Sequence, residues 1–321
     1  MAKGSASSNG FTFSASHAKD AEFKSGGLRS CFEYRDLGIA EATGGRAMAH
    51  VVRAKKGAKP GFGGQLMAKK VTPELARIRG IPPGIDLRSP SRHPDILGAD
   101  DLVIKVEEFR EATGYRLPVS VKLGAGRVRD DIKIAVKDGF DFIELDGMQG
   151  STGAGSAEVL EYVGIPTIAA IIEAIDALEE IDARDRIQLV LMGGLRDGID
   201  AVKALCLGAD AAAFGTATIV AGGCIACMQC HVGQCVTGIA TQDPAHESRY
   251  KPDLEAQNIY RFLEAVRWQI AAIGHALGHD DVRQFGRDDL VALTPEAAAI
   301  TGLPFEPAHR DETGAIAMQS S

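Results

Sequence analysis

The sequence of 321 residues has few aromatic residues and no long apolar run. Aromatic side chains make up 6% of the chain, and there is a single tryptophan. No segment approaches the roughly 18 apolar residues that would span a bilayer, and the opening MAKGSASSNGFTFSASHAKD holds no apolar run of signal-peptide length. These absences argue against a membrane or secreted protein, and we expect a cytoplasmic one.

A cluster of basic residues is also missing. The net charge is −8, the isoelectric point is near 5.5, and lysine and arginine are spread along the chain. Neither a nucleic-acid-binding surface nor a basic membrane-surface helix is indicated. Apolar residues make up 45% of the sequence, so we expect a substantial buried core.

The two ends of the chain differ in composition from its middle. Residues 1–30 are rich in Ser, Gly, Ala and Lys and are expected to be flexible, as is the tail at 306–321. The strand-like runs CFEYRDL and AMAHVVRA flank the turn signal Thr43-Gly44-Gly45, which predicts a β-hairpin. We therefore separate an atypical segment, 1–55, from a main domain at 56–305.

Apolar strands alternate with helical patterns through the middle of this domain. The predicted strands are LPVSVKLG, FDFIELDG, IPTIAAI, IQLVLMGGL and ADAAAFGTA. The predicted helices cover 100–113, 129–138, 155–162, 170–179 and 197–207, and a longer one covers 254–277. This alternation predicts an α/β fold with a parallel sheet of the (β/α) barrel type, whose chemistry lies at the carboxyl ends of the strands.

Glycine turns follow two successive predicted strands. Gly193, Gly194 and Leu195 end one strand, and Gly215, Thr216 and Ala217 end the next. Backbone N–H groups freed by glycine make a phosphate cradle, and barrels commonly hold phosphate after their last two strands. The alternative is that these glycines only turn the chain.

Charged residues stand at the ends of two other predicted strands. Lys122 lies in VSVKLG, where a buried lysine is costly unless it meets an anion. We expect it to face a ligand, although it could also extend from the strand end into solvent. Glu144 and Asp146 occupy alternate positions of IELDG, either as a carboxylate pair or with one of them capping the next turn.

Four of the six cysteines, Cys224, Cys227, Cys230 and Cys235, fall within GGCIACMQCHVGQCVTGIATQDP. The spacing C-x2-C-x2-C-x4-C is typical of an iron–sulfur ligand run, and zinc is the rival interpretation. His231 could serve either site or orient the loop. Cys206 lies in an apolar helix and is predicted to be a core residue.

The ordered motifs resemble a known family. GAKPGFGGQL, SPSRHPDI, SVKLG, DGMQGSTGAG, MGGL, FGTA and the cysteine run are similar to the FMN-binding synthase domain of glutamate synthase. Its short relatives, such as the third subunit of N-methylglutamate synthase, are the nearest resemblance. It extends from about Gly57 to about Phe305. It implies a TIM-type barrel with FMN beside an iron–sulfur cluster.

The resemblance also implies roles for individual residues. Lys122 would contact the flavin or the oxo-acid as the catalytic residue. Flavin contacts and phosphate-holding turns would come from Gln149, Gly150, Ser151, Thr152, Gly193, Gly194, Leu195, Gly215 and Thr216. Cys224, Cys230 and Cys235 match the ligands of a 3Fe-4S cluster, and the additional Cys227 allows a 4Fe-4S cluster.

Three departures from the family pattern stand out. Phe62 replaces a carboxylate of the usual PGEGG, and Met192 replaces the acid of DGGL. Only strands four to eight of the barrel are recognisable, and FEYRDLGIAEATGGRAMAHVVRA resembles instead the opening of a small cupin protein. An incomplete barrel leaves unpaired edges. The N-terminal hairpin could cover them, or a partner chain could, or flavin binding could be impaired.

The implied activity is hydride transfer from FMN to an imine formed from 2-oxoglutarate and ammonia or an amine. Other subunits would then supply the amine and the electrons, and we expect an oligomer. A non-catalytic electron-transfer or scaffold subunit that keeps only the cluster is the main alternative. A phosphate-binding barrel of the nucleotide dehydrogenase kind would explain the glycine turns but not the four clustered thiols.

Overall fold

The fold is given by a computed structural model of the chain. It describes residues 64–88, 96, 98–150, 152–155 and 162–306 in full, and 32–36 and 50–54 as backbone strands. Outside the described residues lie Ser151, Phe62, residues 307–321 and the interior, 156–161, of the predicted helix at 155–162.

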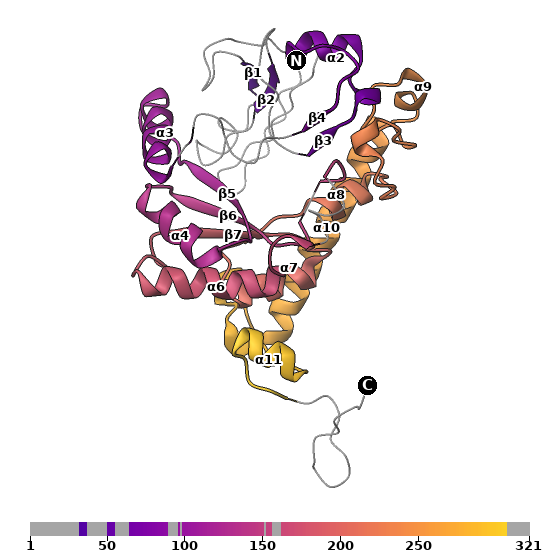
Figure 1. Cartoon of the computed structure of the whole chain (residues 1–321). Coiled ribbons are helices and arrows are strands. Elements are labelled where there is room, and N and C mark those ends of the chain that lie inside the picture. The colour runs from indigo at the N-terminus through magenta and orange to yellow at the C-terminus, as the bar shows by residue number, and fades with distance from the viewer. Residues whose placement is uncertain are drawn as a thin grey trace, which may run out of the picture.

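The centre of the molecule is a four-stranded parallel sheet flanked by helices (Figure 1). Its strands run in the order β5, β6, β7, β8. Their bounds are Ser120–Gly124 (β5), Phe142–Asp146 (β6), Gln188–Met192 (β7) and Ala211–Ala212 (β8). The connecting helices are α4 (Val128–Lys137), α6 (Thr167–Glu180) and α7 (Gly198–Cys206). This confirms the predicted α/β fold with a parallel sheet, which closes no barrel within the described part of the chain.

The strand predicted over IPTIAAI is wrong. Ile165 bonds with the backbone of Ala125 and Met148, but the helix α6 begins at Thr167, directly after Pro166. Proline at the helix start is preorganised for the first turn. The apolar residues that follow bury with a spacing of three and four, as in Ala170, Ile171 and Ala174, which is helical periodicity.

The main hydrophobic core lies between the sheet and α4 and α6. Alternate strand residues Ile143, Leu145 and Leu189 are 0% exposed and pack against these helices. Burial of each such side chain stabilises the fold by about 1.5–3 kcal/mol. Cys206 joins a smaller cluster with Val202 and Phe285, so the predicted core role of this cysteine is confirmed.

The N-terminal elements form two short antiparallel pairs. β1 (Phe32–Asp36) pairs with β2 (His50–Ala54), which confirms the predicted hairpin. β3 (Gln65–Leu66) pairs with β4 (Leu87–Arg88). A 3-10 helix, η2 (Ala68–Lys70), and the helix α2 (Pro73–Arg79) lie between β3 and β4, and α3 (Ala99–Ala112) leads into β5.

The C-terminal third is helical. After β8 come α8 (Thr216–Ala221), the 3-10 turn η3 (Cys230–Val232), α9 (Pro244–Glu247) and the long helix α10 (Pro252–Leu277). The 3-10 turns η4 (Val282–Gln284) and η5 (Arg287–Asp289) precede α11 (Pro295–Thr301). α10 packs along α7 and α8 (Figure 1), which confirms the predicted long helix.

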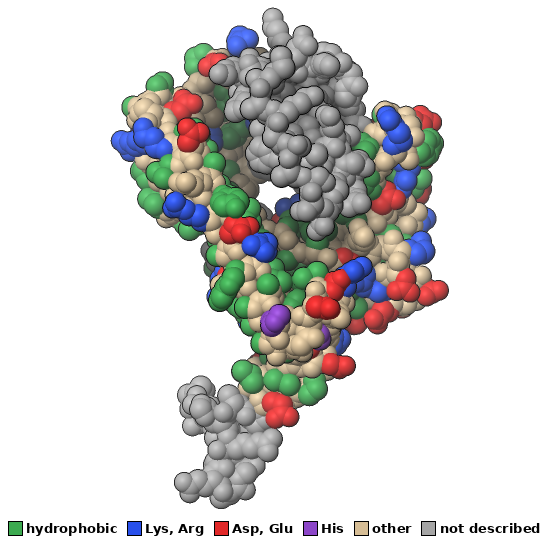
Figure 2. All heavy atoms as spheres, turned by 180° about the vertical axis from the view of Figure 1, so that it is seen from behind, with side chains coloured by type: hydrophobic (Ala, Val, Ile, Leu, Met, Phe, Trp, Pro, Cys, Tyr) green, Lys and Arg blue, Asp and Glu red, His purple; other side chains and the backbone are tan. Residues whose placement is uncertain are grey.

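The surface agrees with the mixed charge pattern of the sequence. Figure 2 shows acidic and basic side chains interspersed over one face of the molecule rather than gathered by sign. Among the described residues, no helix is both long enough and apolar enough to cross a bilayer.

Candidate functional site

The parallel strands bring four loops to one edge of the sheet. Gly124 of β5 is paired with Asp146 of β6, and Asp146 is paired with Met192 of β7. β7 and β8 pair one step earlier, at Leu191 and Ala212. The loops that follow these strands therefore start side by side, as the sequence predicted for a barrel.

The strand face opposite the core carries paired polar groups. Nζ of Lys122 lies 2.8 Å from Oδ2 of Asp146, and the hydroxyl of Ser120 donates to Glu144 across 3.1 Å. Lys122 is 54% exposed, whereas Asp146 is 17% exposed. Glu144 and Asp146 therefore share a face but serve different partners, and the ammonium of Lys122 is held at the carboxyl edge of the sheet.

The loops after β6 and β7 interlock through glycine. Gly193 has φ +104° and Gly194 has φ +75°, which L side chains rarely adopt. A Cβ atom on Gly193 would lie 2.8 Å from the nitrogen of Gly147, and one on Gly194 would lie 2.6 Å from Cβ of Gln149. Gly150 meets the Cα of Gly193 in the same way, at 2.9 Å. Side chains at these positions would push the two loops apart.

Gln149 and Thr167 fix this pair of loops to the start of α6. The backbone N–H and the hydroxyl of Thr167 both point to Oε1 of Gln149, at 2.9 and 2.8 Å. The same hydroxyl lies 2.7 Å from the carbonyl oxygen of Gly193, so its one hydrogen is shared between two acceptors. Gln149, predicted from the resemblance to face the flavin, has its side chain turned toward α6.

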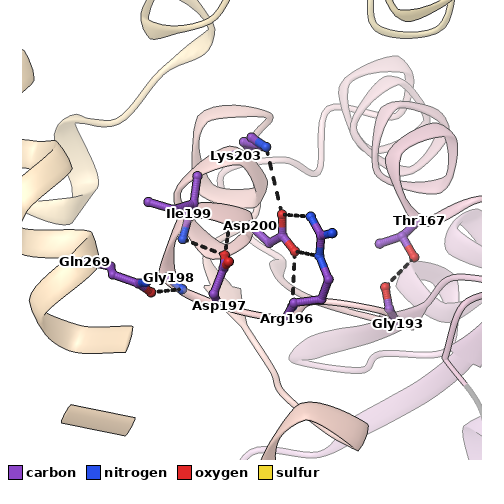
Figure 3. A network of polar contacts seen from close by, with 9 residues as sticks. All are labelled: Thr167, Gly193, Arg196, Asp197, Gly198, Ile199, Asp200, Lys203 and Gln269. Atoms are coloured by element: carbon purple, nitrogen blue, oxygen red, sulfur yellow. Dashed lines mark hydrogen bonds and ion pairs between the residues drawn. The ribbon is translucent and has the colours of Figure 1, made fainter. Parts of the chain in front are cut away.

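A second network holds the start of α7 (Figure 3). Asp197 accepts from the N–H groups of Ile199 and Asp200, and Gln269 of α10 accepts from Gly198 at 2.8 Å. Arg196 donates to both carboxylate oxygens of Asp200. These hydrogen bonds lower the pKa of Asp200 although burial acts against them.

A cavity of about 450 Å³ lies beside the Gly193–Leu195 turn. Its polar wall includes Gln149, Thr167 and Arg196, and its apolar wall includes Ile171 and Leu191. The turn therefore separates an open pocket between α6 and α7 from the polar face of the sheet.

The turns after β7 and β8 present backbone donors. Within the described residues, the N–H groups of Gly194, Leu195, Gly215 and Thr216 donate to no protein acceptor. A Cβ atom on Gly215 would meet no described residue within 4 Å, so this turn is open toward the described part of the chain. Free amides beside an open turn fit a bound phosphate.

The four clustered cysteines lie in the loop between α8 and α9. All are free thiols; Cys235 is buried, and the other three are partly exposed. Ala226 and Met228 have φ 52° and 56°, left-handed conformations that are costly for residues other than glycine and that concentrate at functional sites. Nδ1 of His231 is buried, with no hydrogen-bond partner in the described structure. An unsatisfied buried nitrogen among thiols is suited to a bound group.

The thiols lie close enough to influence one another. Burial raises the pKa of Cys230, and the neighbouring Cys235, Cys224 and Cys227 raise it further. Burial acts to raise the pKa of Cys235 as well, but hydrogen bonds from Thr237 and from backbone amides outweigh it and lower the pKa to about 7. The loop thus favours the thiolate of Cys235 over that of Cys230.

The N-terminal part of the described chain contacts this loop. Met67 donates its N–H to the carbonyl of His231 at 2.9 Å, and Gln65 donates to that of Ala154. A Cβ atom on Gly153 would lie 2.8 Å from Sγ of Cys230. The loop after β6 and the cysteine loop therefore touch, and β3 and the residues after it bind both.

Residues 37–280 match the family model described as the conserved region in glutamate synthase. The chain belongs to the glutamate synthase family. This confirms the resemblance drawn from the motifs, and the match begins ahead of Gly57, where those motifs start.

Several glutamate synthase relatives are similar over most of this chain. A glutamate synthase large subunit-like protein of Rhizobium meliloti is 41% identical over 81% of the chain and 62% of its own length. An archaeal-type glutamate synthase [NADPH] of Dehalococcoides mccartyi is 36% identical over 87% of the chain and 59% of its own length. The chain spans about half to three fifths of the length of such relatives.

Among solved structures, the recombinant flavin-binding domain of baker's yeast flavocytochrome b2 is 20% identical, with a TM-score of 0.42 over 67% of this chain and 41% of that one.

The structure brings only some of the predicted site residues together. Lys122 and the glycine turns meet at the carboxyl edge of the sheet, and Gly153 contacts Cys230. Thr152 is exposed, with its hydroxyl accepting from the N–H of Ala154. Sequence reasoning missed Lys70 and Thr167, because neither belongs to a motif with its own spacing signal.

A single metal ion does not suit the cysteine loop. Within the described residues, no three His, Cys, Asp or Glu side chains converge closely enough to hold one ion. Thiolates that share a zinc ion at about 2.3 Å must lie within about 4 Å of one another. Thiolates around an iron–sulfur core stand further apart, because the core itself separates them. The free thiols are of the donor type that binds an iron–sulfur cluster.

Proposed function

We propose that this chain is an FMN- and iron–sulfur-dependent oxidoreductase of the glutamate synthase type. Its reaction would be reduction of an imine formed from 2-oxoglutarate and ammonia or an amine. The observation that carries the proposal is the contact between the loop after β6 and the cysteine loop, with Gly153 against Cys230. It joins the part of the site suited to a flavin to the part suited to a cluster. The glutamate synthase names of the relatives support the same activity.

The flavin phosphate would be held by the free amides after β7 and β8. Gly194, Leu195, Gly215 and Thr216 offer these donors on neighbouring turns. Bound FMN would supply a hydride for two-electron reduction. The interlocked glycines keep the turns in one arrangement, so the donors are positioned before the ligand arrives.

Lys122 would bind the carboxylate of the oxo-acid. Its ammonium stands on the polar face of the sheet, half exposed and 2.8 Å from Asp146. Asp146 directs the ammonium along the strand edge, which leaves the remaining N–H donors of the lysine for an anion.

The thiols of Cys224, Cys227, Cys230 and Cys235 would hold an iron–sulfur cluster, which supplies single electrons when bound. Three or four iron atoms are both compatible with the four thiols. Partner proteins of the family type would provide electrons and the amine.

The test is an absorption spectrum of anaerobically purified protein, with acid-released flavin and iron counted per chain. Flavin near one per chain beside three or four irons supports the proposal. Ammonium- or methylamine-dependent loss of 2-oxoglutarate, with a chemical reductant present, would then establish the reaction.

Iron without flavin would contradict the enzyme proposal for this chain on its own. It would favour an electron-transfer or scaffold subunit, to which the open four-stranded sheet also lends itself. If the anaerobically purified protein held neither iron nor flavin, that result would contradict both the enzyme proposal and the electron-transfer or scaffold alternative.

A further inference from the structure

Lys70 reaches into the cysteine loop from a distant part of the sequence. Its Nζ donates to the carbonyl oxygen of Cys230 at 2.8 Å and to that of Ala240 at 3.2 Å. These two carbonyls stand on either side of Cys235 in the chain. One ammonium group therefore ties together the two arms of the loop that holds Cys235.

The aliphatic stem of Lys70 lies against the same loop. Gly233 has φ +74°, and a Cβ atom there would lie 3.1 Å from Cγ of Lys70. At the other end of η2, Met67 bonds to His231. The short helix is thus attached to the cysteine loop at both of its ends.

The surroundings of Lys70 are those of a partly buried cation beside thiols. Its side chain is partly buried, and its ammonium is held on the backbone of Cys230. Its neighbour Lys69 is exposed, and no hydrogen bond or ion pair of its side chain is found in the described structure. The two lysines have the same chemistry and differ in whether they touch the loop.

We propose that Lys70 is a positioning residue of the cysteine loop and its fixed countercharge, holding Cys230 and Cys235 at the separation that the cluster requires. This inference rests on the proposed function for the cluster itself, and it assigns a role outside the four thiols. Thiolate ligands concentrate negative charge, and a cation held at their backbone offsets part of it.

Two consequences follow for a bound cluster. Partners that orient metal ligands typically contribute about 10- to 100-fold to metal affinity, so loss of Lys70 should release iron. Reduction adds negative charge to a cluster, so removal of a nearby cation should lower the midpoint potential.

The experiment compares Lys70→Met with Lys69→Met in the whole chain. Both substitutions remove one positive charge and keep the length of the side chain, but only the first removes contacts to the loop. Iron per chain and midpoint potential are measured in anaerobically purified protein. The rate at which iodoacetamide alkylates Cys230 and Cys235 is measured by mass spectrometry after removal of iron. Circular dichroism establishes folding.

Lys70→Met is expected to lose iron about tenfold more readily and to lower the potential of the cluster that remains. At a pH at which the thiols of both variants are ionised, so that the thiolate fraction is the same, it is also expected to speed alkylation of the two cysteines, because the loop is no longer held. Lys69→Met should match the unmodified protein in all three. The proposal is overturned if the two variants agree with each other in iron content, potential and alkylation.

Lys70→Arg keeps the result interpretable if the Met variant does not fold. Arginine retains the charge and the donors, so it should preserve the potential and much of the iron. A potential as low in Lys70→Arg as in a folded Lys70→Gln would overturn the countercharge role. If the unmodified protein holds no iron, the proposed function fails, and the alkylation rates still test whether Lys70 positions the loop.

Discussion

On one face of the sheet, Ile143, Leu145 and Leu189 are sealed against α4 and α6, with 0% exposure. On the other face of the same strands, Lys122 and Asp146 form an ion pair and remain accessible. Alternate residues of a strand point to opposite faces, so five residues of β6 contribute to both. Neighbouring residues of one strand therefore serve different purposes, one packing in the core and the next facing the candidate site.

The comparison teaches where substitutions should act. Changes on the helix-covered face remove buried apolar contact and should alter unfolding. Changes on the polar face should alter binding and turnover, because partly exposed ion pairs contribute little to stability. Four substitutions test this division.

The largest expected effect is that of Leu145→Ala on the covered face. Removal of a fully buried leucine side chain should cost about 2–5 kcal/mol of unfolding free energy. Met192→Ala, on the other face of the neighbouring strand, should cost about 1 kcal/mol or less. Urea denaturation of both variants measures the difference, and equal losses would contradict the division between the two faces.

Gly194→Ala should come next. Its positive φ and the 2.6 Å approach to Gln149 leave no room for a methyl group, so we expect a loss of about 1–3 kcal/mol together with loss of flavin. Gly215→Ala is the control for stability, since its added Cβ atom meets no described residue within 4 Å. Thermal unfolding should separate the two variants clearly. A Gly194→Ala protein as stable as Gly215→Ala would mean that the two loops do not interlock.

Asp138 is a buried polar residue, and its substitution should raise the unfolding free energy rather than lower it. It is 2% exposed, and neither carboxylate oxygen has a hydrogen-bond partner in the described structure. Burial raises the pKa of this group, so its ionised form costs stability above that raised pKa, and the cost disappears as the pH falls toward the ordinary value of 3.8. Asp138→Asn should therefore stabilise the protein by about 1 kcal/mol at neutral pH, and the gain should shrink in acid.

Asp141→Asn provides the contrast to Asp138→Asn. Asp141 accepts from Arg110 and from the N–H of Val119, so its loss should destabilise the fold. Denaturant unfolding at several pH values compares the two. A gain in Asp138→Asn that does not change with pH would show that the charge of Asp138 is not the cause.

The smallest effect on stability is expected for Lys122→Met. Because Lys122 is half exposed, unfolding should change by less than about 1 kcal/mol, whereas affinity for 2-oxoglutarate should fall by more than tenfold. Lys133→Met removes an ion pair of similar length, that with Glu180 at 2.7 Å, on the outer helices. It should leave oxo-acid binding unchanged. Titration calorimetry measures the affinity of both variants for 2-oxoglutarate.

Much of the fold could be predicted from periodicity. The helices at 99–112, 128–137 and 252–277 agree with the predicted ones to within two residues at each end. The structure of the segment at 165–171 could not be predicted in this way, because a short apolar run suits a buried helix as well as a buried strand. The proline at its start was the better guide.

The candidate site was predictable where backbone conformation dictates the residue. Gly193 and Gly194 adopt positive φ angles, which favour glycine at these positions. The spacing of the cysteines can be read directly from the sequence. Lys70 could not be found in this way, because it lies 160 residues from Cys230 and makes its contact through a carbonyl that carries no sequence signal.

The contact between Gln269 and Gly198 has a practical consequence. The single tryptophan, Trp268, is the residue next to Gln269 on α10 and is 69% exposed. Indole emission shifts to shorter wavelength when water is displaced from the ring. The molecule therefore carries one tryptophan probe on the exposed side of α10, next to the residue that contacts α7, and the docking of another protein on that helix can be followed without a label.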